Sequence, residues 1–141
     1  MKRSKKLIVI LLLTGLLFSG CSRENAQQVP EKCRVVTGIH VVFENGPLQM
    51  QRQYTTSSKV RAILNYLRWL DPYGLPKEDP ETVSGSSFYI TLQYSDGCQK
   101  RYLQRADRFL LEDGKPWRRI DPVRAQTLSE ILGKMESDVV I

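Results

Sequence analysis

Hydrophobic and other residues alternate with a period of two over residues 48–54 (LQMQRQY), which is typical of a β-strand that has one buried face. Residues 33–43 (CRVVTGIHVVF) are rich in β-branched side chains and predict a strand. Residues 48–55 predict a second strand, and the Asn45-Gly46 pair between the two predicts a hairpin. The alternation of the second strand sets four side chains on one face: Leu48, Met50, Arg52 and Tyr54.

The second half of the chain contains more segments of this kind. Residues 88–95 (FYITLQYS), 98–105 (CQKRYLQR) and 108–111 predict three further strands. Residues 116–120 close the run, and Pro116 suits the edge of a sheet, where no amide donor is needed.

The turn at Asp96-Gly97 leaves the register of one hairpin open. A two-residue turn and a three-residue turn with a bulge at Gly97 bring opposite faces together. In the bulged register, Cys98 shares the face of Ile90 and Leu92.

Two other segments have apolar residues at the helical period. The first helix is capped by Thr56 or Ser57 and ends at Asp71-Pro72. Its apolar stripe comprises Val60, Ile63, Leu64, Leu67 and Leu70. The second helix begins at Asp121-Pro122, a cap followed by a first-turn proline. Its stripe comprises Ala125, Leu128, Ile131, Leu132 and Met135.

A long polar segment, residues 71–87 (DPYGLPKEDPETVSGSS), separates the first helix from the strands that follow. It contains three prolines, two glycines and four acidic residues. Loops of this length in compact domains are either functional or disordered, and disorder is the simpler interpretation here.

The order of these elements is hairpin, helix, strands, helix. It predicts an α+β fold, in which an antiparallel sheet of about five strands carries two amphipathic helices on one face. A single domain is expected over residues 33–141, because the chain is too short for two ordinary cores.

The N-terminus reads as an export signal. A block of basic residues precedes an apolar run over residues 7–18: Lys2, Arg3, Lys5 and Lys6. Twelve residues are too few to cross a bilayer core of about 30 Å, which takes about 20. The pattern matches the apolar region of a signal peptide, here residues 1–20.

The residues at the end of that run, Ser19-Gly20-Cys21, resemble the lipobox of bacterial lipoproteins. The resemblance covers about the first 22 residues. It implies that Cys21 becomes the lipid-modified N-terminus, followed by a polar tether, so that residues 21–32 link the lipid to the domain. It also implies an extracytoplasmic protein anchored to the cell membrane or the outer membrane by several acyl chains, because one chain alone anchors only marginally. Ordinary signal cleavage is the alternative, since Phe18 stands where the family most often has leucine.

The net charge of +6 would suggest a nucleic-acid partner, but most of it belongs to the export signal. The signal contains four of the 21 basic residues and none of the 15 acidic ones, which leaves 17 against 15, a net charge of +2. A nucleic-acid-binding protein needs a clear basic surplus, so this class is excluded.

Cys33 and Cys98 remain when Cys21 is assigned to the lipid. An even pair in an oxidising compartment predicts a Cys33–Cys98 disulfide; two free thiols are the alternative.

The sequence names no reaction. His40 is its single histidine and lies inside a predicted strand. No phosphate-binding glycine loop, paired-cysteine zinc motif or nucleophile elbow is present. Glu78, Asp79 and Glu81 cluster among prolines without EF-hand spacing, which is typical of a solvated stretch. We therefore expect no catalytic residues, no metal and no cofactor.

Binding is the remaining class. Arginine and aromatic residues, which dominate protein interfaces, crowd the C-terminal strands. The candidate binding residues are Arg101, Arg105, Arg118, Arg119, Tyr102 and Trp117. A solvated basic face is the simpler interpretation of this set. The favoured function is a tethered, non-catalytic binding module for an envelope protein; the alternatives are a structural accessory of the envelope and a hydrolase with an unrecognised carboxylate pair.

Overall fold

The computed structural model describes residues 34–139, and its sheet contains six antiparallel strands in the order β2-β1-β3-β4-β5-β6. The strands are β1 (Val36–Asn45), β2 (Leu48–Tyr54), β3 (Ser87–Tyr94), β4 (Gln99–Arg105), β5 (Phe109–Glu112) and β6 (Arg118–Arg119). The predicted antiparallel sheet is confirmed. The predicted number of about five is consistent with the six observed, of which β6 pairs with β5 over only two residues.

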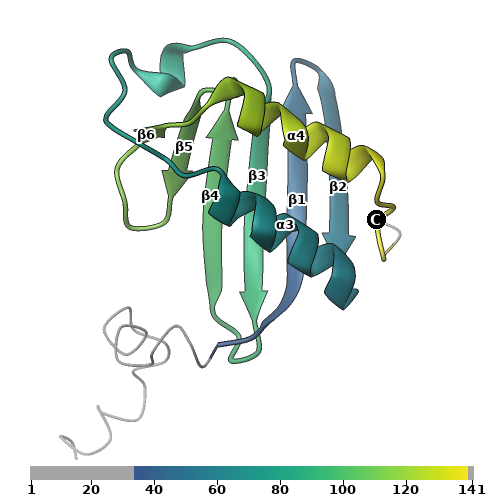
Figure 1. Cartoon of the computed structure of the whole chain (residues 1–141). Coiled ribbons are helices and arrows are strands. Elements are labelled where there is room, and N and C mark those ends of the chain that lie inside the picture. The colour runs from purple at the N-terminus through teal and green to yellow at the C-terminus, as the bar shows by residue number, and fades with distance from the viewer. Residues whose placement is uncertain (1–33, 140–141) are drawn as a thin grey trace, which may run out of the picture. The chain divides into compact units, whose positions relative to one another are not determined.

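Two helices, α3 (Ser57–Trp69) and α4 (Pro122–Gly133), lie side by side across the same face of the sheet (Figure 1). A short 3-10 turn, η2 (Pro80–Thr82), interrupts the long segment between α3 and β3. The α+β architecture with both helices on one face therefore agrees with the sequence pattern.

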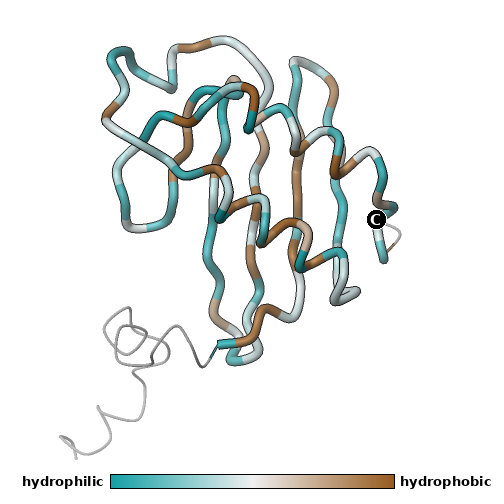
Figure 2. Tube along the Cα trace, in the orientation of Figure 1, coloured by the Kyte–Doolittle hydropathy of each residue, from teal (hydrophilic) through white to brown (hydrophobic). Residues whose placement is uncertain are grey.

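The core lies between the helices and this face of the sheet. Figure 2 shows which strands are the most hydrophobic: β1 carries the most hydrophobic stretch of the sheet, whereas β2 and β4 are mostly hydrophilic. The sheet contributes Ile39, Val41, Tyr54, Phe88, Ile90, Leu92 and Leu110. The helices and their ends contribute Val60, Ile63, Tyr66, Leu70, Ala125, Leu128 and Leu132. The predicted stripes are right for both helices, except that Tyr66 was not among them.

The β1–β2 and β3–β4 hairpin turns each use a glycine with positive φ. The first hairpin pairs Asn45 with Leu48, so Gly46 and Pro47 form its two-residue loop, and Gly46 adopts a φ of 57°. The asparagine of the predicted Asn-Gly turn thus belongs to the strand. In the second hairpin the Tyr94 amide donates to the Cys98 carbonyl at 2.9 Å, and Gly97 has a φ of 85°. This is the bulged register, which places Cys98 on the face of Leu92.

The ends of both helices are held by hydrogen bonds from side chains outside the helices. Thr56 occupies the N-cap of α3, but its side chain makes no capping bond. Instead, the Asp138 carboxylate accepts hydrogen bonds from the amides of Thr55 (2.8 Å) and Thr56 (2.7 Å). Arg52 donates to the carbonyls of Leu132 and Met135 at the end of α4. At its other end α4 is capped as predicted, by Asp121, which accepts from the amides of residues 123 and 124.

The long segment 71–86 packs against the sheet, so the expectation of disorder is wrong. Tyr73 forms a β-bridge with Arg119, and Pro80 is buried. Near β3, the Ser86 carbonyl accepts from the amide of Ala106 at 2.8 Å. A Cβ at Gly85 would lie 2.9 Å from the Cβ of Ala106, so only glycine allows this approach.

Candidate binding site

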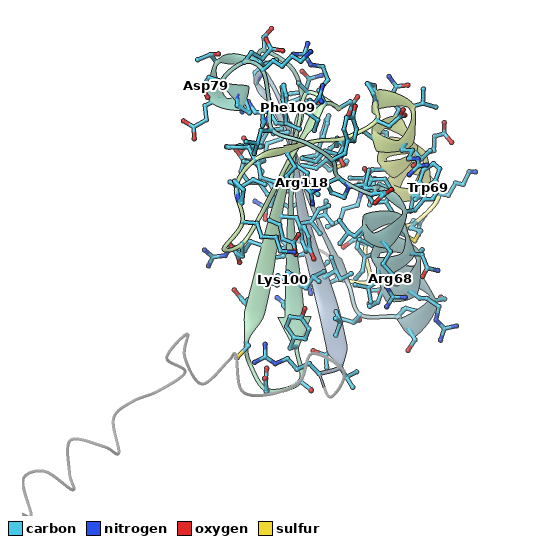
Figure 3. The ribbon with its side chains drawn as sticks, turned by 60° about the vertical axis from the view of Figure 1, so that its left-hand side comes forward. Arg68, Trp69, Asp79, Lys100, Phe109 and Arg118 are labelled. Carbon is cyan, nitrogen blue, oxygen red and sulfur yellow. The ribbon has the colours of Figure 1, made fainter. Side chains whose placement is uncertain are left out.

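The second face of the sheet carries no helix among the described residues. Figure 3 shows both helices along one side of the sheet and side chains without a covering layer along most of the other. The strand register places four apolar side chains directly opposite one another across this face: Val42, Tyr89, Leu103 and Leu111. Tyr89 is 38% exposed and the others are half-buried. We call these four residues the apolar row.

Polar residues flank the apolar row on one side. His40, Thr91 and Arg101 form the neighbouring row across β1, β3 and β4. Arg101 is exposed, and within residues 34–139 its guanidinium has no hydrogen bond or ion pair. The described residues thus leave this cation available to an outside partner.

The long loop covers the other flank. Phe109, which is paired with Arg105 on this face, is only 3% exposed. Figure 3 shows it beneath the segment that carries Asp79. Arg105 joins the loop to the sheet, since it donates to the Ser87 hydroxyl (3.3 Å) and to the Glu81 carbonyl (3.2 Å). The apolar row therefore has one covered border and one open, cationic border.

A glutamine pair fixes the far end of this face. The Gln53 amide donates to the Gln93 side-chain oxygen at 2.9 Å, across β1 at Gly38. A Cβ at Gly38 would lie 2.7 Å from that oxygen, so glycine is what lets the two glutamines meet. This end of the face is consequently polar.

The six candidate binding residues do not share one surface. The register puts Arg101, Arg105 and Arg119 on the helix-free face. Trp117 directly precedes β6, and continuing the β5–β6 register by one residue brings it opposite Leu111. Arg118 and Tyr102 have the opposite parity and belong to the helix-covered face.

Tyr102 belongs to a structural ion-pair cluster. Lys100 Nζ lies 2.6 Å from Glu112 Oε1 and 5.4 Å from the centre of the Tyr102 ring. Burial opposes ionisation of Glu112, but hydrogen bonds from Lys100 and Lys115 outweigh it and hold the Glu112 pKa below its usual value. Burial raises the pKa of Tyr102. The charges of this cluster are paired with one another, so its role is structural.

The carboxylates of the long loop have structural contacts. Glu78 pairs with Arg108, and Asp79 caps η2 by accepting from the Glu81 amide at 3.0 Å. Within the described part of the chain, no three histidine, cysteine or acidic residues group as a metal site would need.

Sequence reasoning missed two aromatic residues. Trp69 and Tyr73 are each 47% exposed, and each stacks with an arginine. Arg124 lies 5.3 Å from the Trp69 ring centre, and Arg119 lies 4.9 Å from that of Tyr73. A sequence signal was available only for Trp69, as an aromatic residue off the apolar stripe of its helix.

The predicted lipidation site Cys21 and the disulfide partner Cys33 lie outside the described residues. Cys98 is half-buried beside the β3–β4 turn. None of the helices formed by residues 34–139 has the length and apolar character needed to span a bilayer.

Comparison with known proteins found nothing similar: no family model, no curated protein and no solved structure matches the chain.

Proposed function

We propose that this chain is a lipid-anchored, extracytoplasmic lipoprotein that holds an envelope protein on the helix-free face of its sheet, without catalysis. The observation that carries the proposal is the apolar row on that face, bordered by Arg101, whose guanidinium has no ion pair within residues 34–139. The anchor is supported by the signal-like run of residues 7–18 and by the lipobox-like Ser19-Gly20-Cys21.

The distance from the proposed lipid to the domain suits this role. The described chain begins against the sheet, where the Val35 carbonyl accepts from the Ser95 amide at 2.9 Å. About 13 residues then separate Cys21 from Val35, and a chain of that length spans at most about 45 Å. A domain on such a tether reaches proteins within a few nanometres of the membrane surface.

The chemistry of the face indicates the kind of partner. Burying the tyrosine, leucine and valine side chains of the apolar row in an interface is favourable, because it removes apolar surface from water. Tyrosine and arginine are also enriched in binding hot spots. On this face the acidic Glu44 already accepts from Gln49. The Arg101 guanidinium makes no ion pair among the described residues, although the Asp113 carboxylate accepts a hydrogen bond from the Arg101 backbone amide at 2.7 Å. The complementary partner is therefore a protein surface with an apolar strip flanked by carboxylates.

Site-specific photo-cross-linking in intact cells tests the proposal. A photoreactive residue is placed at Thr91 on the helix-free face, and at the exposed Arg61 on α3 as the control. We expect one defined protein adduct from position 91 and none from position 61. Adding Arg101→Glu should sharply lower the yield from position 91, because it inverts the charge that faces the partner. The proposal is overturned if position 91 gives no adduct, or if both positions give the same adducts.

A further inference from the structure

A small hollow lies where the long loop meets the outer strands, at the edge of β5 and β6. Its volume is about 230 Å³, enough for one amino-acid side chain and less than most cofactors fill. The floor is apolar and comprises Phe109, Ile120 and Pro122. Phe109 and Ile120 are 3% and 2% exposed: Ile120 belongs to the hydrophobic core, and Phe109 is covered by the long loop, so both are held in place by the fold rather than by a ligand.

Tyr73 forms one wall of the hollow. Its amide donates to the Arg119 carbonyl at 2.9 Å, and the Arg119 amide donates back to the Tyr73 carbonyl at 3.1 Å. This bridge fixes the loop against β6, while Tyr73 as a whole remains 47% exposed. The wall is therefore built into the fold before any ligand arrives.

The rim of the hollow is cationic. Three basic residues line it: Lys77, Arg108 and Arg119. The single carboxylate of the rim, Glu78, forms an ion pair with Arg108. Arg119 stacks on the Tyr73 ring, and its buried Nε–H has no hydrogen-bond partner. Within residues 34–139, neither Lys77 nor the Arg119 guanidinium has an anionic partner. Two positive charges therefore stand over an apolar floor without neutralisation.

We infer that this hollow binds the C-terminal residue of a peptide, its carboxylate on Arg119 and Lys77 and its apolar side chain on Phe109 and Ile120. A guanidinium matches the two oxygens of a carboxylate geometrically. A partly desolvated cation without a counter-ion is unfavourable, and the ligand relieves this state. The apolar floor distinguishes such a ligand from inorganic anions. The site is separate from the apolar row, and it stands whether or not the chain is lipid-anchored.

The test follows the arginine side chains of the full-length protein in detergent micelles by ¹⁵N NMR. The Nε–H signal of Arg119 is assigned by its loss in Arg119→Lys. We expect N-acetyl-leucine to shift this signal saturably and N-acetyl-leucinamide, which lacks the charge, to leave it unchanged. Inorganic phosphate should bind at least about tenfold more weakly, because it gains nothing from the apolar floor. Equal binding of the amide, equal binding of phosphate, or no shift with any probe overturns the inference.

A charge-matched pair of variants separates a built site from a general attraction to cations. The signal of Arg108, on the same rim, reports binding when Arg119 is replaced. Arg119→Gln should weaken N-acetyl-leucine binding by about tenfold or more, the usual value of a charge-assisted hydrogen bond. Arg118→Gln removes the same charge one residue away, from a side chain of opposite parity, and should leave the affinity unchanged. Equal losses in the two variants contradict the assignment.

Discussion

The hydroxyl of Tyr66 on α3 donates a hydrogen bond to the side-chain oxygen of Gln104 on β4, in the middle of the core. Gln104 is completely buried, and its amide donates to the carbonyl of Ala125 on α4 at 3.2 Å. The Tyr66 oxygen also lies 3.2 Å from that carbonyl. One polar cluster thus joins both helices to the sheet, which specifies how the two helices lie on it.

Replacing Tyr66 by Phe should lower the free energy of unfolding by about 1–2 kcal/mol, because the buried Gln104 oxygen then lacks a donor. Urea denaturation followed by circular dichroism measures this. Tyr89→Phe removes a hydroxyl from the exposed face and should change stability by less than about 0.5 kcal/mol. Equal effects of the two variants would show that the cluster contributes nothing specific.

Tyr66 should also make the protein sensitive to alkali. Burial raises the pKa of Tyr66 well above its ordinary value of 10.0. The unfolded chain therefore releases this proton near pH 10 while the folded chain keeps it, so stability falls as pH rises above 10. The slope is about 1.4 kcal/mol per pH unit for one proton. Urea titrations at pH 9 to 11 should show that the stability of the wild type falls more steeply with pH than that of Tyr66→Phe, and the difference in slope should approach one proton toward pH 11. An unchanged slope contradicts the assignment.

Most of the fold was predictable because it depends on local periodicity. The alternation in the strands and the helical stripes each place apolar side chains on one side, and one packing arrangement brings most of them together, although Leu48 and Met50 of β2 stay exposed. Tyr66 was missed because its hydroxyl makes it look like a surface residue. Only the tertiary contact with Gln104, 38 residues away, makes its burial favourable.

The candidate sites were less predictable, for two physical reasons. Neighbouring residues of a strand point to opposite faces, so Arg118 and Arg119 separate although they adjoin in sequence. The hollow at Arg119 also needs Tyr73, which lies in a segment whose composition resembles a disordered linker. The backbone bridge between Tyr73 and Arg119 joins positions 46 residues apart, and no sequence period reports such a pairing.

Asp138 should make the protein sensitive to acid. The hydrogen bond from Lys59, followed by those from the amides of Thr56 and Thr55, holds the pKa of Asp138 well below its ordinary 3.8. A lowered folded pKa stabilises the protein above the unfolded value, and this contribution is lost as pH falls below it. Asp138→Asn should therefore be less stable than the wild type at pH 7, and the difference should shrink steadily below about pH 4. Glu136→Gln is the control, since only its backbone carbonyl contacts Lys59. A difference independent of pH would show that Asp138 acts without its charge.

We predict that Cys33 and Cys98 form a disulfide. The Ser95 amide donates a hydrogen bond to the Val35 carbonyl. This bond fixes Val35, which is two residues after Cys33 in the sequence, next to the turn that carries Cys98. The basis of the prediction is the even pair of cysteines that remains in an oxidising compartment.

Peptide mapping without reductant should recover the two cysteine peptides as one species. Cys33→Ser and Cys98→Ser should each lower stability by about 2–4 kcal/mol, and the double variant by no more than either, since all three lose the same cross-link. Two alkylatable thiols on the folded, exported protein would contradict the prediction.

The last prediction concerns the anchor. If Cys21 carries the lipid, the exported Cys21→Ser protein should leave the membrane fraction once its signal peptide is removed. Fractionation is combined with mass spectrometry of the N-terminal peptide, because an uncut signal would also hold the chain at the membrane. In the wild type, the mass at Cys21 should include several acyl chains, since a single chain binds only reversibly. A Cys21→Ser protein that is cut and still membrane-bound would place the attachment elsewhere in the chain.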